Sequence, residues 1–163
     1  MEQNKFVLAA VTALLANNDM HYMHLLSKGK DFDKSHNLAQ DYYDKLAEDV
    51  DYLMELTLEV GYTVPNYSKA LDVIPDYPCE NLPEYDYATV IEHIKAIIGR
   101  YINALRDLRN GTNKDDIQSR LDDMIRDWEK ELNYRLTRRQ ESPVQGGFIN
   151  TGLDERVSHF VGL

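Results

Sequence analysis

The sequence predicts an all-α protein whose main domain is a four-helix bundle. Prolines occur only at 65, 75, 78, 83 and 143, so residues 1–64 and 84–142 form two long proline-free blocks. Because proline interrupts helix interiors, these blocks are where long helices can form. Each block has a turn-forming break, at Gly29 in the first and at Gly111 in the second, and each is therefore expected to fold as two helices.

The four helices are expected at residues 4–27, 34–61, 86–110 and 113–140. Asp33 is expected to cap the second helix, and Thr112 or Asn113 the fourth. Short connections make each pair an antiparallel hairpin. The link from 62 to 85 carries four prolines and has room for a short helix near Tyr67 to Leu71. Two hairpins joined by one long crossover form a ferritin-like four-helix bundle.

Residues 1–140 are assigned to this bundle and residues 141–163 to a C-terminal tail. The tail contains glycines, among them Gly146, Gly147 and Gly152, and no sustained helical period, so we expect it to be flexible. It also contains four apolar residues that could dock onto a neighbouring subunit or a protein partner: Phe148, Ile149, Phe160 and Val161.

Composition excludes several classes of protein. The 163 residues carry a formal net charge of -10, which argues against a general surface for binding nucleic acid. The single cysteine, Cys79, excludes an intramolecular disulfide and a cysteine-based zinc site. The N-terminus does not resemble a signal peptide, and no apolar run is long enough to span a membrane. We therefore expect a soluble cytoplasmic protein.

The second helix carries two contrasting faces. At 100° per residue its apolar residues share one face, which is the expected core: Ala39, Tyr43, Leu46, Val50, Leu53, Thr57 and Val60. Its acidic residues lie nearly opposite: Asp44, Glu48, Asp51, Glu55 and Glu59. A solvated charged face is the simplest interpretation. However, stacked carboxylates repel one another unless cations lie between them, and Lys45 is the only cation from 37 to 68.

The first helix is apolar nearly all round in the stretch FVLAAVTALLA. A single bundle buries one stripe of each helix, so the excess apolar surface predicts packing between subunits.

Two histidines, His24 and His36, flank the turn at Gly29, whereas Asp51 and Glu55 lie toward the other end of the second helix. His36 and Asp51 are separated by roughly 22 Å along the helix axis, so they cannot bind one metal ion within a chain. A two-fold partner running antiparallel would bring the histidines of one subunit to the carboxylates of the other. Imidazole and carboxylate together suit iron and other first-row divalent ions.

The segment from His21 to Pro65 resembles the signature of the Dps family, the miniferritins. The family pattern has a histidine, a second histidine twelve residues later, an aspartate fifteen residues after that and a glutamate four further on. His24, His36, Asp51 and Glu55 stand in this register. Further matches are Lys28, Gly29, Phe32, Tyr43, Asp44, Gly61, Pro65 and His21.

This resemblance implies a dodecameric shell that stores ferric mineral and protects against oxidative stress. It implies a di-iron ferroxidase site between two subunits, at which peroxide or oxygen oxidises Fe(II). His24 and His36 of one subunit would face Asp51 and Glu55 of the other. Asp44, Glu48 and His21 are weaker candidate ligands. DNA binding in this family often uses a lysine-rich N-terminal tail, which this chain lacks, so nucleic acid is not an expected partner.

One departure from the family pattern concerns the residue after the first histidine. The family usually has tryptophan there, and this chain has Leu25; its one tryptophan is Trp128. An alternative function is therefore a non-catalytic Dps-like shell or scaffold subunit that docks to a larger assembly through its tail. A third possibility is a small monomeric or dimeric helical binding protein.

Overall fold

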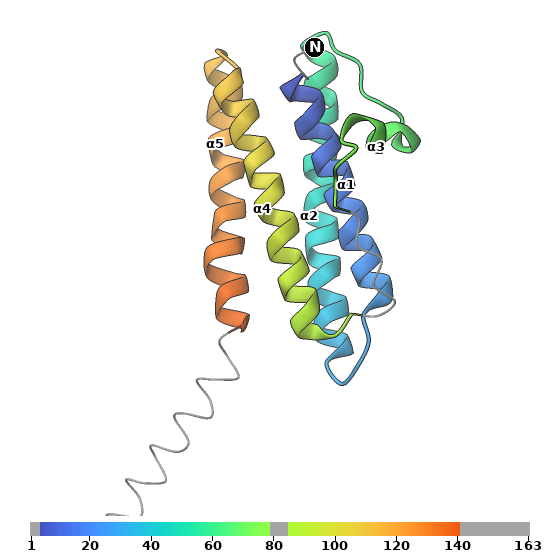
Figure 1. The fold of residues 1–163 in the computed structure, drawn as a ribbon. Coiled ribbons are helices and arrows are strands. Elements are labelled where there is room, and N and C mark those ends of the chain that lie inside the picture. The colour runs from blue at the N-terminus through green and yellow to red at the C-terminus, as the bar shows by residue number, and fades with distance from the viewer. Residues whose placement is uncertain (1–3, 79–84, 141–163) are drawn as a thin grey trace, which may run out of the picture.

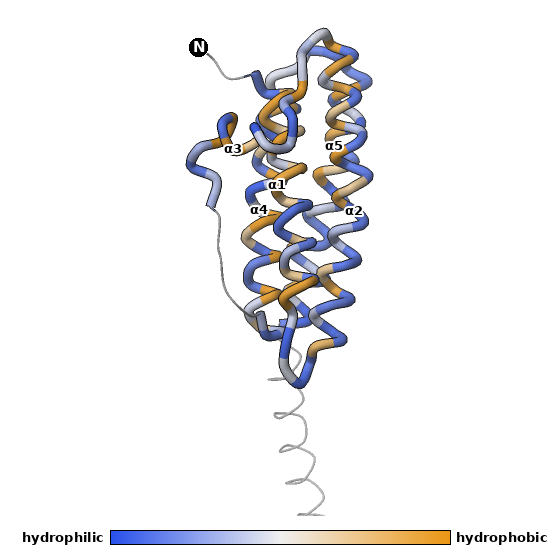
Figure 2. Tube along the Cα trace, turned by 90° about the vertical axis from the view of Figure 1, so that its right-hand side faces the viewer, coloured by the Kyte–Doolittle hydropathy of each residue, from blue (hydrophilic) through white to orange (hydrophobic). Residues whose placement is uncertain are grey.

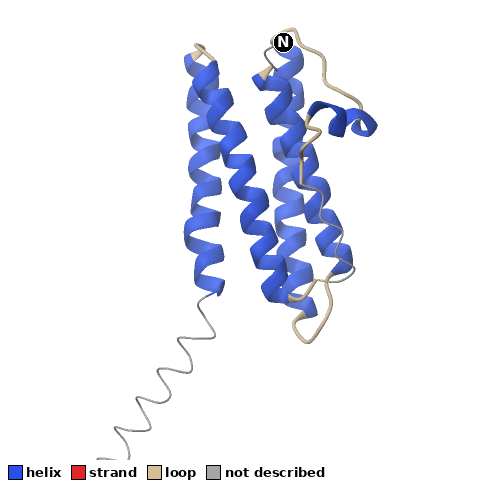
Figure 3. Ribbon diagram, in the orientation of Figure 1, coloured by secondary structure: helices blue, strands red, loops and turns tan. Residues whose placement is uncertain are grey.

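The computed structural model describes residues 4–78 and 85–140, and helices are the only regular elements in that part of the chain (Figures 1 and 3). The four long helices are α1 (Lys5–Leu26), α2 (Phe32–Glu59), α4 (Tyr87–Gly111) and α5 (Asp115–Lys130). Figure 1 shows α1 beside α2 and α4 beside α5, each as an antiparallel hairpin. The predicted ferritin-like bundle of two hairpins is confirmed.

The helix starts differ slightly from those expected. Asp31, not Asp33, precedes α2; its carboxylate forms an ion pair with Lys34 (2.8 Å) and does not cap the helix. Thr112 ends α4, and Lys114 precedes α5 without a side-chain cap. Asp86 does cap α4, because its carboxylate accepts a hydrogen bond from the backbone N–H of Thr89 (2.8 Å).

The long crossover contains the expected short helix, as a 3₁₀ turn η1 (Tyr67–Lys69) followed by α3 (Ala70–Val73). This segment lies against α1 (Figure 1). Val11 and Leu15 of α1 join Ala70 and Tyr77 in an apolar cluster separate from the main core. Part of the excess apolar surface of α1 is therefore covered by the chain's own crossover, and the prediction that it packs against another subunit is wrong for this part.

The main core lies between α1, α2, α4 and α5, and Figure 2 shows hydrophobic and hydrophilic residues alternating around these helices. On α2 the core face is rotated slightly from the expected one. Leu38, Tyr42 and Leu56 are buried, whereas Tyr43 and Val50 are only partly buried. Large side chains from α4 and α5, including Tyr101 and Trp128, are completely enclosed.

The turn between α1 and α2 is fixed by its own geometry and by a long-range backbone contact. Gly29 adopts a φ of 103°, a conformation that favours glycine. The N–H of Lys28 donates to the carbonyl of Tyr85 (2.9 Å), and the N–H of Tyr85 donates to the carbonyl of Leu26 (3.1 Å). The start of α4 is thus tied to the end of the bundle that carries the histidines.

The tail assigned to residues 141–163 lies outside the described residues, so the division at residue 140 stays a prediction. Among the residues that the structure describes, no helix is both long and apolar enough to cross a membrane.

Candidate metal-binding face

His24 and His36 lie face to face at the turn end of the α1–α2 hairpin. Their ring centroids are 3.7 Å apart. The Nδ1 atom of His24 lies 3.1 Å from the backbone carbonyl oxygen of His36, and Nδ1 of His36 lies 2.8 Å from that of His24. The hairpin therefore holds the two imidazoles by two reciprocal hydrogen bonds. The spacing of the two residues around the turn predicted that they would lie close together.

These hydrogen bonds determine which ring nitrogens can bind a metal. A carbonyl oxygen can only accept, so each Nδ1 carries the proton and donates it. In a neutral imidazole Nε2 then carries the lone pair, and orientation of this kind by a backbone carbonyl is typical of histidine ligands. Both histidines are half-buried, so their rings are held firmly and yet lie at the surface of the subunit.

The column of stacked rings extends on both sides of this pair. Phe32 stacks on His36 with centroids 4.9 Å apart. On the other side His21 lies 6.2 Å from His24 and stacks on Tyr43 at 4.8 Å. His21 is exposed, so a third imidazole lies at the surface next to His24 and His36.

The four candidate carboxylates lie along the exposed side of α2. Asp44 accepts a hydrogen bond from Gln40 (2.7 Å). Glu48, Asp51 and Glu55 are exposed and have no hydrogen-bond or ion-pair partner within residues 4–78 and 85–140. Lys45 turns away from them, because its Nζ lies 4.4 Å from the centroid of the Trp128 ring in the core. The predicted acidic face therefore lacks an interleaved cation.

One chain does not bring these histidines and carboxylates together. His36 and Asp51 stand on one uninterrupted helix, α2, which keeps them roughly 22 Å apart along its axis. Within the described part of the chain, no three side chains of His, Cys, Asp or Glu gather closely enough to hold a metal ion. The candidate ligands are thus divided into a histidine pair at the turn end of the α1–α2 hairpin and carboxylates farther along α2.

Comparison with solved structures identifies this arrangement of helices. The chain superposes on Helicobacter cinaedi CAIP with a TM-score of 0.73 and 16% identity, covering 83% of this chain and 96% of that one. Dps from Staphylococcus aureus gives a TM-score of 0.70 at 17% identity, covering 83% and 92%. Dps from Thermosynechococcus elongatus gives 0.57 at 17% identity, covering 83% of each chain.

The chain has the Dps fold. No protein-family model matches its sequence, and no curated protein sequence matches it either. The likeness that these comparisons show therefore lies in the path of the backbone.

Within this Dps fold the residue after the first histidine, Leu25, is 61% exposed. Trp128, the chain's one tryptophan, is instead buried among α2, α4 and α5. Its indole N–H donates to Oδ2 of Asp49 (2.6 Å), and the hydroxyl of Tyr101 donates to the same oxygen (2.9 Å). The indole is therefore on the core side of α2, not beside the histidines.

Sequence analysis did not identify a role for Asp49, which lies off the predicted acidic face of α2. Its position on α2 shares the core side with Leu46 and Leu53, which was the available signal. Burial raises the pKa of the Asp49 carboxyl, and the hydrogen bonds from Trp128 and Tyr101 oppose that rise. This carboxylate holds three helices together and is not aimed at solvent.

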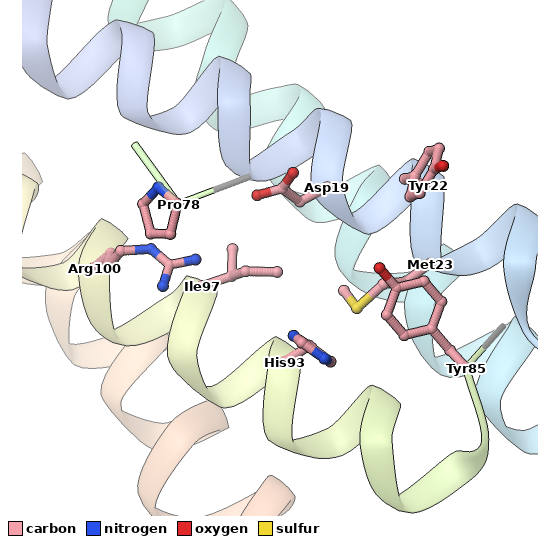
Figure 4. A pocket seen from close by; sticks show the side chains of 8 residues that line it. All are labelled: Asp19, Tyr22, Met23, Pro78, Tyr85, His93, Ile97 and Arg100. Carbon is pink, nitrogen blue, oxygen red and sulfur yellow. The ribbon is translucent and has the colours of Figure 1, made fainter. Parts of the chain in front are cut away.

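A small polar hollow lies between α1 and α4, beside the crossover (Figure 4). Asp19 reaches toward it from α1, and His93 and Arg100 from α4. Its volume is about 20 Å³, room for roughly one water molecule. Asp19 accepts a hydrogen bond from the Tyr77 hydroxyl (2.7 Å). The hollow is too small for an organic substrate, and Asp19 uses its carboxylate to fasten the crossover.

Proposed function

We propose that this protein is a Dps-like ferroxidase that oxidises Fe(II) at sites between two subunits and stores the ferric product inside an oligomeric shell. His24 and His36 of one subunit and Asp51 and Glu55 of its two-fold partner bind the iron. Asp44 and Glu48 continue the acidic face next to these ligands and attract further iron. His21 extends the histidine side of the site.

The observation that carries this proposal is the reciprocal hydrogen bonding of His24 and His36. Both Nδ1 atoms are used, so both Nε2 atoms are available to a metal. A structural histidine pair would be expected to use both nitrogens internally. Mixed imidazole and carboxylate ligands suit iron, and the carboxylates of the acidic face supply the negative charge that favours Fe(III) over Fe(II).

The distribution of exposed apolar residues supports the two-fold partner. Tyr22 and Leu25 are exposed beside the histidines. Leu58 and Tyr62 are exposed at the other end of α2. An antiparallel second copy would cover both ends at once, and it would also join each histidine pair to a carboxylate pair. Such dimers would be the units of the shell, which the resemblance to the Dps family implies is a dodecamer.

The reaction is balanced with peroxide as oxidant. Two Fe(II) ions each lose one electron, the O–O bond of hydrogen peroxide breaks, and its oxygens take up two electrons and two protons to give two water molecules. With dioxygen as oxidant the same ions are oxidised and peroxide is formed first. The protein's part is to hold both ions near one oxidant and to bind the ferric product more tightly than the ferrous substrate.

The test is Fe(II) oxidation by the iron-free protein. Iron is added anaerobically, substoichiometric peroxide or oxygen follows, and ferric absorbance is compared between wild type and a His24→Ala, Asp51→Ala double variant. Asp33→Ala, an exposed carboxylate outside the site, serves as the control. Fast oxidation by wild type and control, but not by the double variant, supports the proposal. Traces equal to the protein-free blank in all three would overturn it.

A non-catalytic Dps-like shell, docked to a larger assembly through residues 141–163, is the second candidate. The observation that favours it is Leu25, an exposed aliphatic residue where the family usually places tryptophan. This candidate predicts assembled shells with no oxidation above the blank. The ferroxidase assay therefore separates the two.

A further inference from the structure

A second hollow, of about 240 Å³, lies between the first half of α2 and the helical segment that follows α5, residues 131–139. We call it the cationic pocket because three cationic side chains line it, those of Lys45, Arg135 and Arg139. The two carboxylates that line it are Glu131 and, at the exposed rim, Asp41. The helical turn that carries Glu131 and Arg135 is π-helical, η2 (Glu131–Leu136).

Glu131 is buried and fixes two of the three cations. Its Oε1 accepts a hydrogen bond from Nη1 of Arg135 (2.7 Å) and lies 3.6 Å from Nζ of Lys45. Its Oε2 accepts a hydrogen bond from the Tyr42 hydroxyl (2.9 Å). The charge of Glu131 is thus satisfied internally. Because Lys45 and Arg135 are already held in place, a ligand that uses their remaining N–H groups loses little side-chain entropy on binding.

Arg139 lines the same pocket, and its side chain is exposed. It makes no hydrogen bond or ion pair within residues 4–78 and 85–140. Burial and the neighbouring Glu131 raise the pKa of the Tyr42 hydroxyl, and the charges of Arg139 and Arg135 oppose that rise. Both guanidinium groups therefore contribute positive charge near the Tyr42 hydroxyl.

The π-helical turn carries two of the groups that line the pocket, Glu131 and Arg135. Its i→i+5 hydrogen bonds place more residues in each turn than an α-helix has. Residues four apart, such as Glu131 and Arg135, therefore lie more nearly in line along the helix axis than they would in an α-helix. Single π turns are uncommon and occur frequently at functional sites. This one sits directly in the wall of the pocket.

We propose that the cationic pocket binds a phosphate group. A guanidinium matches the geometry of a phosphate through paired N–H donors, and Arg139 has all of its donors available. The pocket is large enough for one phosphate and a short substituent. The site is separate from the proposed iron ligands, since none of them lines it and it uses the helical segment that follows α5. Its existence does not depend on ferroxidase activity.

The test uses the full-length, iron-free assembled protein, because ferric iron would itself bind the probe. Binding of inorganic phosphate is measured by isothermal titration calorimetry. Arg139→Gln is compared with Arg138→Gln. Arg138 is the matched control, because it is the adjacent arginine, is exposed and lies over the Tyr134 ring instead of in the pocket. Circular dichroism checks that both variants stay folded.

We expect saturable phosphate binding that Arg139→Gln weakens by about tenfold or more, the effect of losing one charge-assisted hydrogen bond. Arg138→Gln should leave the affinity within about twofold. The phosphate group could be the free ion or part of a larger molecule, and glycerol phosphate as a second probe distinguishes the two. Equal affinity for both probes assigns the site to the phosphate of a larger molecule. Preference for inorganic phosphate assigns it to the free ion. No saturable binding of either probe, or equal loss in both variants, would overturn the proposal.

Discussion

Nδ1 of His24 donates to the backbone carbonyl of His36, and Nδ1 of His36 donates to that of His24. Each histidine therefore orients the other, and each connects α1 to α2 across the turn at Gly29. The pair forms half of the proposed site before any metal or second subunit is present. The predictions that follow test whether the other half comes from a partner, what covers α1, and what the buried carboxylate of Asp49 does.

Mixing two inactive variants should restore activity. His24→Ala and Asp51→Ala are each expected to be inactive alone. In a mixed dimer one site would lose both ligands and the other would keep both, so random mixing should restore about a quarter of the sites. The measurement is the rate of Fe(II) oxidation by co-expressed subunits. Recovery to this level requires a site shared between chains, whereas a site within one chain would give none.

Replacing Leu25 with aspartate should weaken assembly. Leu25 is 61% exposed in the subunit and lies beside the histidines, in the surface that the proposed partner covers. A buried, unpaired carboxylate at such an interface costs several kcal/mol. Mass photometry should show a shift from the shell to small species. The control Ala96→Asp places the same charge on the exposed side of α4, and it should assemble normally; if Leu25→Asp also assembles, that surface is not the interface.

Truncating Leu15 to alanine should destabilise the subunit itself. Leu15 lies on α1 under the crossover, in the cluster with Ala70 and Tyr77. Removing a buried leucine side chain lowers the free energy of unfolding by about 2–4 kcal/mol. Denaturant titrations followed by Trp128 fluorescence, at several protein concentrations, measure it. Leu25→Ala should change the free energy of unfolding of the subunit by less than about 0.5 kcal/mol. A Leu15→Ala effect that disappears on dilution would instead mean that a partner subunit covers this face.

The stability that Asp49 contributes should depend on pH in a definite direction. Burial raises its pKa in the folded state. For an acid with a raised folded pKa, the contribution is full below the unfolded pKa of about 3.9 and is lost as the pH rises through the folded value. Asp49→Asn cannot titrate. The free energy of unfolding of wild type minus that of Asp49→Asn should therefore be larger near pH 4 than near pH 7.

This difference is measured by denaturant titration at a series of pH values, again with Trp128 as the probe. Using the difference removes the contributions of the surface carboxylates, which the two proteins share. A difference that grows with pH would show that the hydrogen bonds from Trp128 and Tyr101 outweigh the burial of the Asp49 charge.

The helices and the histidine pair could be predicted from the sequence because both depend on local rules. The proline-free blocks determine where helices can run, and the turn at Gly29 determines that His24 and His36 meet. The separation of Asp51 from His36 also follows from the helical rise alone. These predictions need no knowledge of how distant segments pack.

The features that sequence analysis missed all depend on contacts between distant segments. Asp49 could be placed on the core side of α2, but its donors Trp128 and Tyr101 come from α5 and α4. Glu131 is buried where Tyr42 and Lys45 of α2 contact it. The crossover covers Val11 and Leu15, which an apolar pattern alone cannot distinguish from a subunit contact.

The backbone hydrogen bonds between Lys28 and Tyr85, and between Tyr85 and Leu26, have a consequence for the order of folding. The α1–α2 hairpin is local in sequence and can form early, but these bonds close a long loop whose entropy must be overcome first. During synthesis on the ribosome, the histidine end of the hairpin therefore lacks its full support until the start of α4 has emerged. Iron that meets the nascent chain before that moment meets a pair of histidines on a turn that is not yet fixed.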